Sequence, residues 1–133
     1  MKVLTPEKIK YLIVHCSDTP DNYNELDIHK MHLQFGWDGI GYHKIILRNG
    51  KLISGRPEYW VGAHVKGINE KSLGVCLIGK NNFSKYQFET LKKLLTLWKK
   101  KYPSAEILGH YQSIKTEKTC PNFDVKKWCI ENL

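Results

Sequence analysis

The stretch Tyr11-Leu12-Ile13-Val14-His15 is an apolar run that ends in a histidine. A second apolar run, Ile107-Leu108-Gly109, leads in the same way into His110. Short runs of this kind are typical of buried strands in a sheet that is covered on both faces. Because neighbouring strands lie about 4.8 Å apart, two histidines at strand ends can reach one metal ion. We therefore predict that His15 and His110 lie at the ends of buried strands, as candidate metal ligands.

A cysteine completes the candidate ligand set. Cys120 precedes Pro121, which favours an extended backbone, and Lys118 lies on the same side of such a segment. Two imidazoles and one thiolate suit zinc (Zn2+), and three protein ligands leave a fourth position for water. Such a site is equipped to hydrolyse amides, because zinc lowers the pKa of bound water and polarises carbonyl groups. Core packing is the alternative, since each of these residues taken singly is more often a core residue than a ligand.

The length of 133 residues predicts one domain over residues 1–133, with a core sufficient for folding. The sequence has no linker-like tract, internal repeat or apolar stretch of membrane-spanning length. Residues 1–7 lack the features of a secretory signal, so we expect synthesis in the cytosol, where thiols stay free or bind metal. We accordingly predict that Cys16, Cys76 and Cys129 are packing residues, with a ligand role for Cys16 left open.

The charge balance is strongly basic, with a net charge of +8 and a pI of about 9.3. This favours an acidic partner, which can be nucleic acid, a membrane surface or an anionic cell wall. The sequence contains no recognised nucleic-acid-binding motif and no regular alternation of aromatic and basic residues. We therefore expect neither nucleic-acid binding nor membrane insertion.

Periodicity along the chain predicts an α/β fold, a single domain with a central mixed sheet flanked by about three helices. The predicted helices cover residues 25–35, 84–102 and 124–132, and further strands are predicted over 42–47, 51–54 and 73–78. In the first helix Ile28, Met31 and Phe35 form the apolar stripe, and His29 and His32 are expected at the surface. The second helix starts with a capping box, and Asn49-Gly50 predicts a hairpin.

Several further short motifs occur in a fixed order along the chain. They are Ile13–Ser17, Gly36-Trp37, Ile40–His43, Gly55-Arg56, Val61–His64 with Gly67 and Asn69, Leu73–Gly79, and His110 with Lys118–Asp124. Together they resemble the zinc-dependent N-acetylmuramoyl-L-alanine amidases of the type-2 amidase and peptidoglycan recognition protein family. The resemblance spans nearly the whole chain and looks strongest towards the small single-domain phage lysozymes of that family. Several motifs in the right order are far more specific than any one of them.

The resemblance implies roles for five residues. It identifies His15, His110 and Cys120 as zinc ligands, and Tyr42 and Lys118 as catalytic residues that stabilise the oxyanion. The implied reaction is hydrolysis of the amide that joins N-acetylmuramic acid to L-alanine in peptidoglycan. No carboxylate in the sequence is assigned as the general base.

Two further positions are affected by the resemblance. His64 corresponds to a family position that lines the cleft, so we expect it to contact substrate, whereas His43 is expected to be structural. The segment between His110 and Cys120 is slightly longer than in the phage enzymes. Lys115 therefore stays open as the alternative to Lys118.

The expected partner is peptidoglycan, and the expected state is a monomer. We favour a phage endolysin that acts on the wall once the membrane has been permeabilised, and a cytosolic wall-recycling amidase is left open. A peptidoglycan-binding module without activity is the main alternative, although such modules lack a metal ligand and this chain has all three. Related phage lysozymes also regulate a phage polymerase, and the sequence does not test that role.

Overall fold

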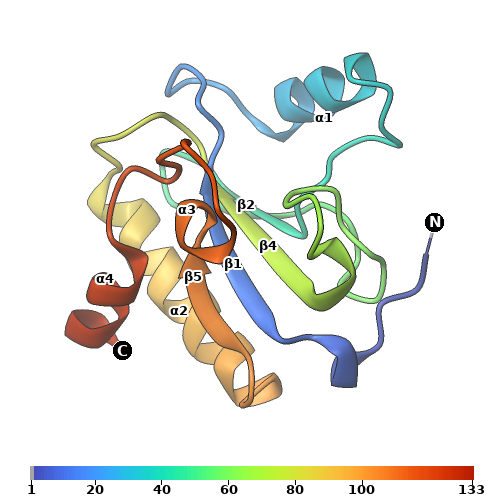
Figure 1. The fold of residues 1–133 in the computed structure, drawn as a ribbon. Helices are drawn as coiled ribbons and strands as arrows, with labels where there is room; N and C mark the ends of the chain where they lie inside the picture. Colours follow the sequence, from blue (N-terminus) through green and yellow to red (C-terminus); the bar gives the residue numbers. More distant parts are fainter. Residues whose placement is uncertain (1) are drawn as a thin grey trace.

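Five strands form one mixed sheet in the computed structural model, which describes residues 2–133 (Figure 1). The strands are β1 Tyr11–Cys16, β2 Lys44–Ile46, β3 Leu52–Ser54, β4 Ser72–Leu77 and β5 Glu106–Gly109. They lie in the order β3-β2-β4-β1-β5. β1 pairs in parallel with β4 and β5, β2 pairs in parallel with β4, and β2 and β3 form an antiparallel hairpin. The predicted mixed sheet is confirmed.

Four α-helices surround this sheet in the described part of the chain: α1 Glu25–Gln34, α2 Lys85–Lys101, α3 His110–Ser113 and α4 Val125–Asn132. Two 3-10 turns cover Pro6–Lys8 and Asn69–Lys71. α2 begins at the predicted capping box, in which Ser84 Oγ accepts a hydrogen bond from Gln87 N–H. α3 was not predicted, because a single turn is too short to show a helical period. None of the helices within residues 2–133 has the length and apolar character needed to cross a membrane.

The side chains of β1 alternate between two faces of the sheet. Val14 joins the main core cluster, to which α2 and α4 contribute. Ile13 instead packs with Val65 and Leu108 in a smaller cluster. The main core therefore lies on the α2 side, which is behind the sheet in Figure 1. Strand alternation places the His15 side chain on the opposite face, with Ile13.

Two predictions for the first helix were wrong. Phe35 lies just beyond α1 and is 59% exposed, because Ile28 carries most of the packing of this helix against Ile45 and Ile78. His32 is buried rather than at the surface, and its Nδ1 accepts a hydrogen bond from Gly41 N–H at 2.8 Å. The backbone partner satisfies this buried nitrogen, while burial lowers the pKa of His32 to about 4 and keeps the ring neutral. His29 is exposed, as expected.

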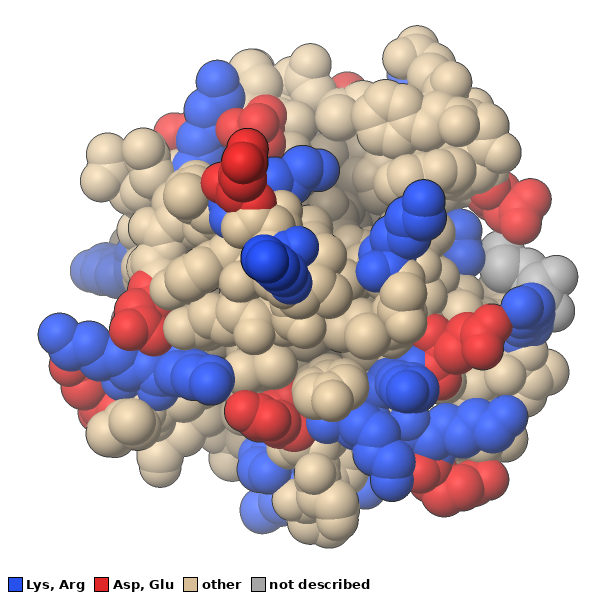
Figure 2. Space-filling model, in the orientation of Figure 1, with Lys and Arg blue, Asp and Glu red and all other residues tan. Residues whose placement is uncertain are grey.

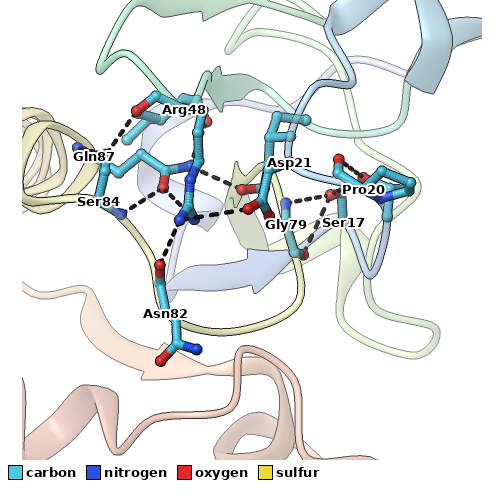
Figure 3. A network of polar contacts seen from close by, with 11 residues as sticks. Ser17, Pro20, Asp21, Arg48, Gly79, Asn82, Ser84 and Gln87 are labelled. Atoms are coloured by element: carbon cyan, nitrogen blue, oxygen red, sulfur yellow. Dashed lines mark hydrogen bonds and ion pairs between the residues drawn. The ribbon is translucent and has the colours of Figure 1, made fainter.

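Arg48, which follows β2, contacts the loop after β1 and the segment around the start of α2 (Figure 3). Its guanidinium donates to Gln87 Oε1 at 3.3 Å and to the Asn82 carbonyl at 2.6 Å, and it pairs with Asp21 at 3.5 Å. Asp21 belongs to the loop between β1 and α1, whereas Asn82 lies just before α2 and Gln87 lies in its first turn. The cation therefore holds the loop that follows β1 against the body of the domain.

A half-buried carboxylate, Glu58, at the other end of α2 predicts a measurable loss of stability in acid. Glu58 accepts hydrogen bonds from Tyr102 Oη at 2.9 Å, Trp98 Nε1 at 3.3 Å and Lys101 Nζ at 3.2 Å. Burial alone raises the pKa of Glu58, but these donors and the Lys101 charge outweigh it and hold the pKa below its ordinary value of 4.5. The ionised form is thus favoured by folding, and its contribution is lost as the pH falls through the folded-state pKa.

We expect Glu58→Gln to be about 1.5 kcal/mol less stable than the wild type near neutral pH. The difference should shrink towards zero in acid, because the wild-type carboxylate is then protonated as well. Urea unfolding at about pH 7 and at a pH well below the folded-state pKa of Glu58 measures both values. Glu70→Gln is the control, since Glu70 pairs with Lys2 at the exposed surface and its loss should change stability little at either pH. An equal loss for Glu58→Gln at both pH values would contradict this account.

Candidate metal centre and active site

Three predicted ligands meet at the carboxyl-end edge of the sheet. His15 is the penultimate residue of β1, and His110 follows β5 directly as the first residue of α3. Because β1 and β5 are parallel neighbours, their carboxyl ends lie at one edge. The loop after α3 brings Cys120 to the same place, so that one ligand atom from each residue lies within 4.8 Å of the others. In the part of the chain that the structure describes, no second group of three potential ligands converges in this way.

The donor set fits zinc in both chemistry and protonation. Zinc binds neutral imidazole nitrogen and thiolate sulfur, and three such ligands are typical of catalytic sites. Burial and the neighbouring His64 and His110 lower the pKa of His15 well below 6.5, and burial and the Lys118 charge lower that of His110. Both rings are therefore neutral at neutral pH, which is the form that binds metal.

Cys16 contacts the candidate ligand Cys120 through both its backbone N–H and its thiol. The backbone N–H of Cys16 donates to Cys120 Sγ at 3.0 Å, and the two sulfur atoms are 3.5 Å apart. A hydrogen bond with the Cys16 thiol and burial raise the pKa of Cys120, so that ionisation of Cys120 needs a nearby cation. The predicted packing role of Cys16 was therefore incomplete, because its backbone and its thiol both support a proposed ligand. Cys76 and Cys129 pack in the sheet and on α4 as expected.

A cavity of about 570 Å³ opens over these three ligands. Its lining includes every predicted site residue, namely His15, Tyr42, His64, His110, Lys118 and Cys120, whereas Lys115 is not part of it. The surface is hollowed beneath α1 in the upper part of Figure 2, and Lys and Arg side chains spread over the lower part of that face. A second cavity of about 530 Å³ lies at the N-terminal region and is lined mainly by charged residues such as Lys8 and Glu70, without a cluster of potential ligands.

Tyr42 lies just before β2 rather than within it, and it lines the cavity beside the three candidate metal ligands. Its ring centroid is 5.1 Å from that of His15. Burial raises the pKa of Tyr42 well above 10, so the phenol keeps its proton and remains a hydrogen-bond donor. The preceding Gly41 is needed here, because a Cβ at that position would overlap the Ala63 carbonyl. This close approach explains the glycine in the Ile40-Gly41-Tyr42 motif.

Comparison with known proteins agrees with this geometry. The model of the N-acetylmuramoyl-L-alanine amidase family matches residues 5–123. The chain belongs to this family. The endolysin of Escherichia phage T7 is 38% identical to it, over 95% of this chain and 89% of its own length. Peptidoglycan-recognition protein LB of Drosophila melanogaster is 34% identical, over 84% of this chain and 53% of its own length.

Solved structures of the amidase family share the fold. The endolysin amidase LysCS from Clostridium intestinale superposes with a TM-score of 0.84 and 26% identity, over 98% of this chain and 86% of that one. Bumblebee PGRP-SA superposes with a TM-score of 0.84 and 27% identity, over 98% and 84% of the two chains. The family and the fold that the sequence motifs indicated are thereby confirmed.

The remaining predicted residues of this amidase-family chain divide into two groups. His43 is structural as expected, because its Nδ1 accepts from Gly74 N–H at 3.1 Å and its Nε2 bonds the Trp60 carbonyl at 2.8 Å. His64 lines the cavity, and it also contacts a proposed ligand directly, with 2.9 Å between its Nδ1 and His15 Nε2. Sequence reasoning missed this second contact, since His64 lies in a loop and carries no periodic signal.

Two other parts of the cavity were also missed. One wall consists of His32, Phe35 and Trp37, in which the Phe35 and Trp37 ring centroids are 5.3 Å apart. The sequence signal was available, because Gly36 ends the helix between two aromatic residues. Among the residues that line the cavity, all within the described range, Asp18 supplies the one carboxylate. Asp18 lies two residues after the end of β1 and has a positive φ of 56°.

Proposed function

We propose that the chain is a zinc-dependent N-acetylmuramoyl-L-alanine amidase that cleaves peptidoglycan as a phage endolysin during host lysis. The observation that carries this proposal is the convergence of His15, His110 and Cys120 within 4.8 Å, beneath a cavity of about 570 Å³. Membership of the amidase family and the similarity to the endolysin of phage T7 over most of both chains support it. Residues 1–133 would then be one catalytic domain.

The protein residues have distinct parts in this proposal. His15, His110 and Cys120 would hold the zinc ion, which would supply an activated water and polarise the scissile carbonyl. The Tyr42 phenol donates a hydrogen bond to the oxygen on which negative charge develops. Lys118 is exposed and brings a positive charge to the same cavity, which it lines together with His110. The aromatic wall beside α1 offers apolar surface to substrate.

Zinc content and bond cleavage, measured together, test the proposal. Purified protein should carry about one zinc ion per chain, and it should release new amino-terminal L-alanine from purified peptidoglycan. Removal of the ion by a chelator should abolish cleavage, and added zinc should restore it. A zinc-free protein that binds peptidoglycan without cutting it would replace the enzyme by a recognition module.

Whether the chain is an endolysin or a wall-recycling amidase is decided by substrate size. An endolysin must cleave intact sacculi, whereas a recycling enzyme works on soluble muropeptides. We expect faster release of amino-terminal L-alanine from sacculi, at equal concentrations of the target bond. A strong preference for soluble muropeptides would favour the recycling role.

The structure offers a matched pair of lysines for testing the catalytic cation. Lys118 lines the cavity, and Lys115 is exposed outside it. We expect Lys118→Ala to lower kcat on peptidoglycan by about 100-fold, because a charge aimed at the developing oxyanion is lost. Lys115→Ala should stay close to wild type, and both variants should retain zinc. A large loss in Lys115→Ala with none in Lys118→Ala would reverse the assignment.

A further inference from the structure

Ser72 is connected to the proposed metal centre although it does not line the cavity. It is the first residue of β4 and is fully buried. Ser72 Oγ lies 3.3 Å from His64 Nε2 and 2.8 Å from the Ile68 carbonyl. The other nitrogen of His64, Nδ1, lies 2.9 Å from His15 Nε2. A continuous chain of hydrogen bonds therefore runs from the Ile68 carbonyl through Ser72 and His64 to His15.

The donor and acceptor of each hydrogen bond follow from the Ile68 carbonyl, which ends this series of hydrogen bonds. The Ile68 carbonyl can only accept, so the single hydroxyl proton of Ser72 is donated to it along the shorter of the two contacts. Ser72 Oγ is then an acceptor towards His64, which requires a proton on His64 Nε2. A neutral imidazole has one N–H, so His64 Nδ1 is an acceptor and His15 Nε2 must be the donor. The remaining nitrogen of His15, Nδ1, carries a free lone pair.

The His64 ring is held where this chain requires it. The backbone N–H groups of His64 and Val65 both donate to Asn69 Oδ1, at 2.9 and 2.8 Å. Gly74 lies against the His64 ring, and a Cβ at Gly74 would come within 2.6 Å of His64 Nδ1. Gly62 lies on a further side, and a Cβ there would come within 2.7 Å of the His64 ring. A side chain at either glycine would overlap the imidazole, so the two glycines provide the space in which the ring makes these hydrogen bonds.

We propose that Ser72 is a positioning residue, which acts through His64 to fix His15 in the tautomer with Nε2 protonated and Nδ1 available to the metal. The inference rests on the proposed zinc site and adds to it the group that selects the binding nitrogen. Outer partners of this kind orient metal-bound histidines and raise their affinity for the ion. Ser72 touches neither substrate nor metal in this arrangement.

Nitrogen NMR of the zinc-free protein tests the tautomers directly. Imidazole ¹⁵N chemical shifts and two-bond couplings distinguish a protonated ring nitrogen from an unprotonated one. We expect His15 and His64 to be both protonated on Nε2. A proton on Nδ1 of either ring would overturn the inference, and this result needs no variant.

Zinc affinity tests the role of the hydroxyl. We expect Ser72→Ala to bind zinc about 10-fold more weakly than the wild type in competition with a chelator. Ser72→Thr, which keeps the hydroxyl, should recover most of the affinity. The matched control is Ser84→Ala, which also removes a hydroxyl with two hydrogen bonds but at the start of α2, and it should bind zinc like the wild type.

The outcomes separate this inference from the proposed function. A wild type that binds no zinc would overturn the metal centre itself. A wild type that binds zinc, with Ser72→Ala folded and equally tight, would overturn the role of Ser72 alone. If Ser72→Ala does not fold, the tautomers of the wild type still decide the question.

Discussion

Cys120→Ser is expected to lose zinc and amidase activity together. The thiolate is the one anionic ligand of the proposed centre, and a serine hydroxyl stays protonated and binds zinc poorly. Cys120 Sγ also accepts the backbone N–H of Cys16, which stabilises its charge. We expect the rate of release of amino-terminal L-alanine to fall by at least about 1000-fold, because the ion's stabilisation of the transition state is worth several kcal/mol.

A second cysteine gives the matched control for this prediction. Cys129 is half-buried on α4 and packs against the main core, away from the cavity. Cys129→Ser makes the same chemical change and should keep about one zinc per chain and the wild-type rate. Zinc content by elemental analysis, together with the peptidoglycan assay, compares the two variants. Retention of zinc and activity in Cys120→Ser would remove this cysteine from the ligand set.

The candidate ligands were predictable because each lies next to a recognisable local feature of the sequence. His15 and His110 each end an apolar run, and Cys120 precedes a proline. Their convergence needs more than these signs, because it depends on β1 and β5 being parallel neighbours. Strand order is set by long-range packing, so the residues alone left core packing open as an alternative. The resemblance to a known family supplied the missing arrangement.

Helical periodicity predicted the apolar stripe of the first helix incorrectly, and the reason is physical. It groups Ile28, Met31 and Phe35 on one side of a helix but does not say how far the supporting core extends. In the structure Ile28 is covered and Phe35 is largely exposed at the cavity wall. The error is informative, because an aromatic side chain left exposed beside a candidate active site is available to substrate.

The hydrogen-bonded support of the site was not predictable from the sequence. Ser72 begins an apolar strand, where a small buried serine has no distinguishing pattern, and His64 lies in a loop. Ser72 is connected to His15 through His64 because β4 is the neighbour of β1 and because Gly74 leaves room for the His64 ring. Such support depends on ångström-level placement, which neither composition nor periodicity encodes.

Tyr42→Phe is expected to lower catalysis strongly while leaving the metal centre intact. The phenol keeps its proton because burial raises its pKa well above 10, and it lines the cavity beside His15. Loss of one donor to a developing oxyanion costs about 100- to 1000-fold in kcat. We expect kcat and kcat/KM to fall together, with KM nearly unchanged, since the bond strengthens only in the transition state. Zinc content should remain at the wild-type level.

The control for Tyr42→Phe is a tyrosine from the same apolar cluster. Tyr23 packs with Ile28 and Ile45, as Tyr42 does, but it does not line the cavity. Tyr23→Phe removes a hydroxyl from this cluster and should leave kcat and zinc content unchanged. If Tyr42→Phe lost zinc, or raised KM with kcat intact, the phenol would be a structural or substrate-binding group. A donor to the transition state is supported if Tyr42→Phe lowers kcat with KM and zinc content unchanged, and Tyr23→Phe does not lower kcat.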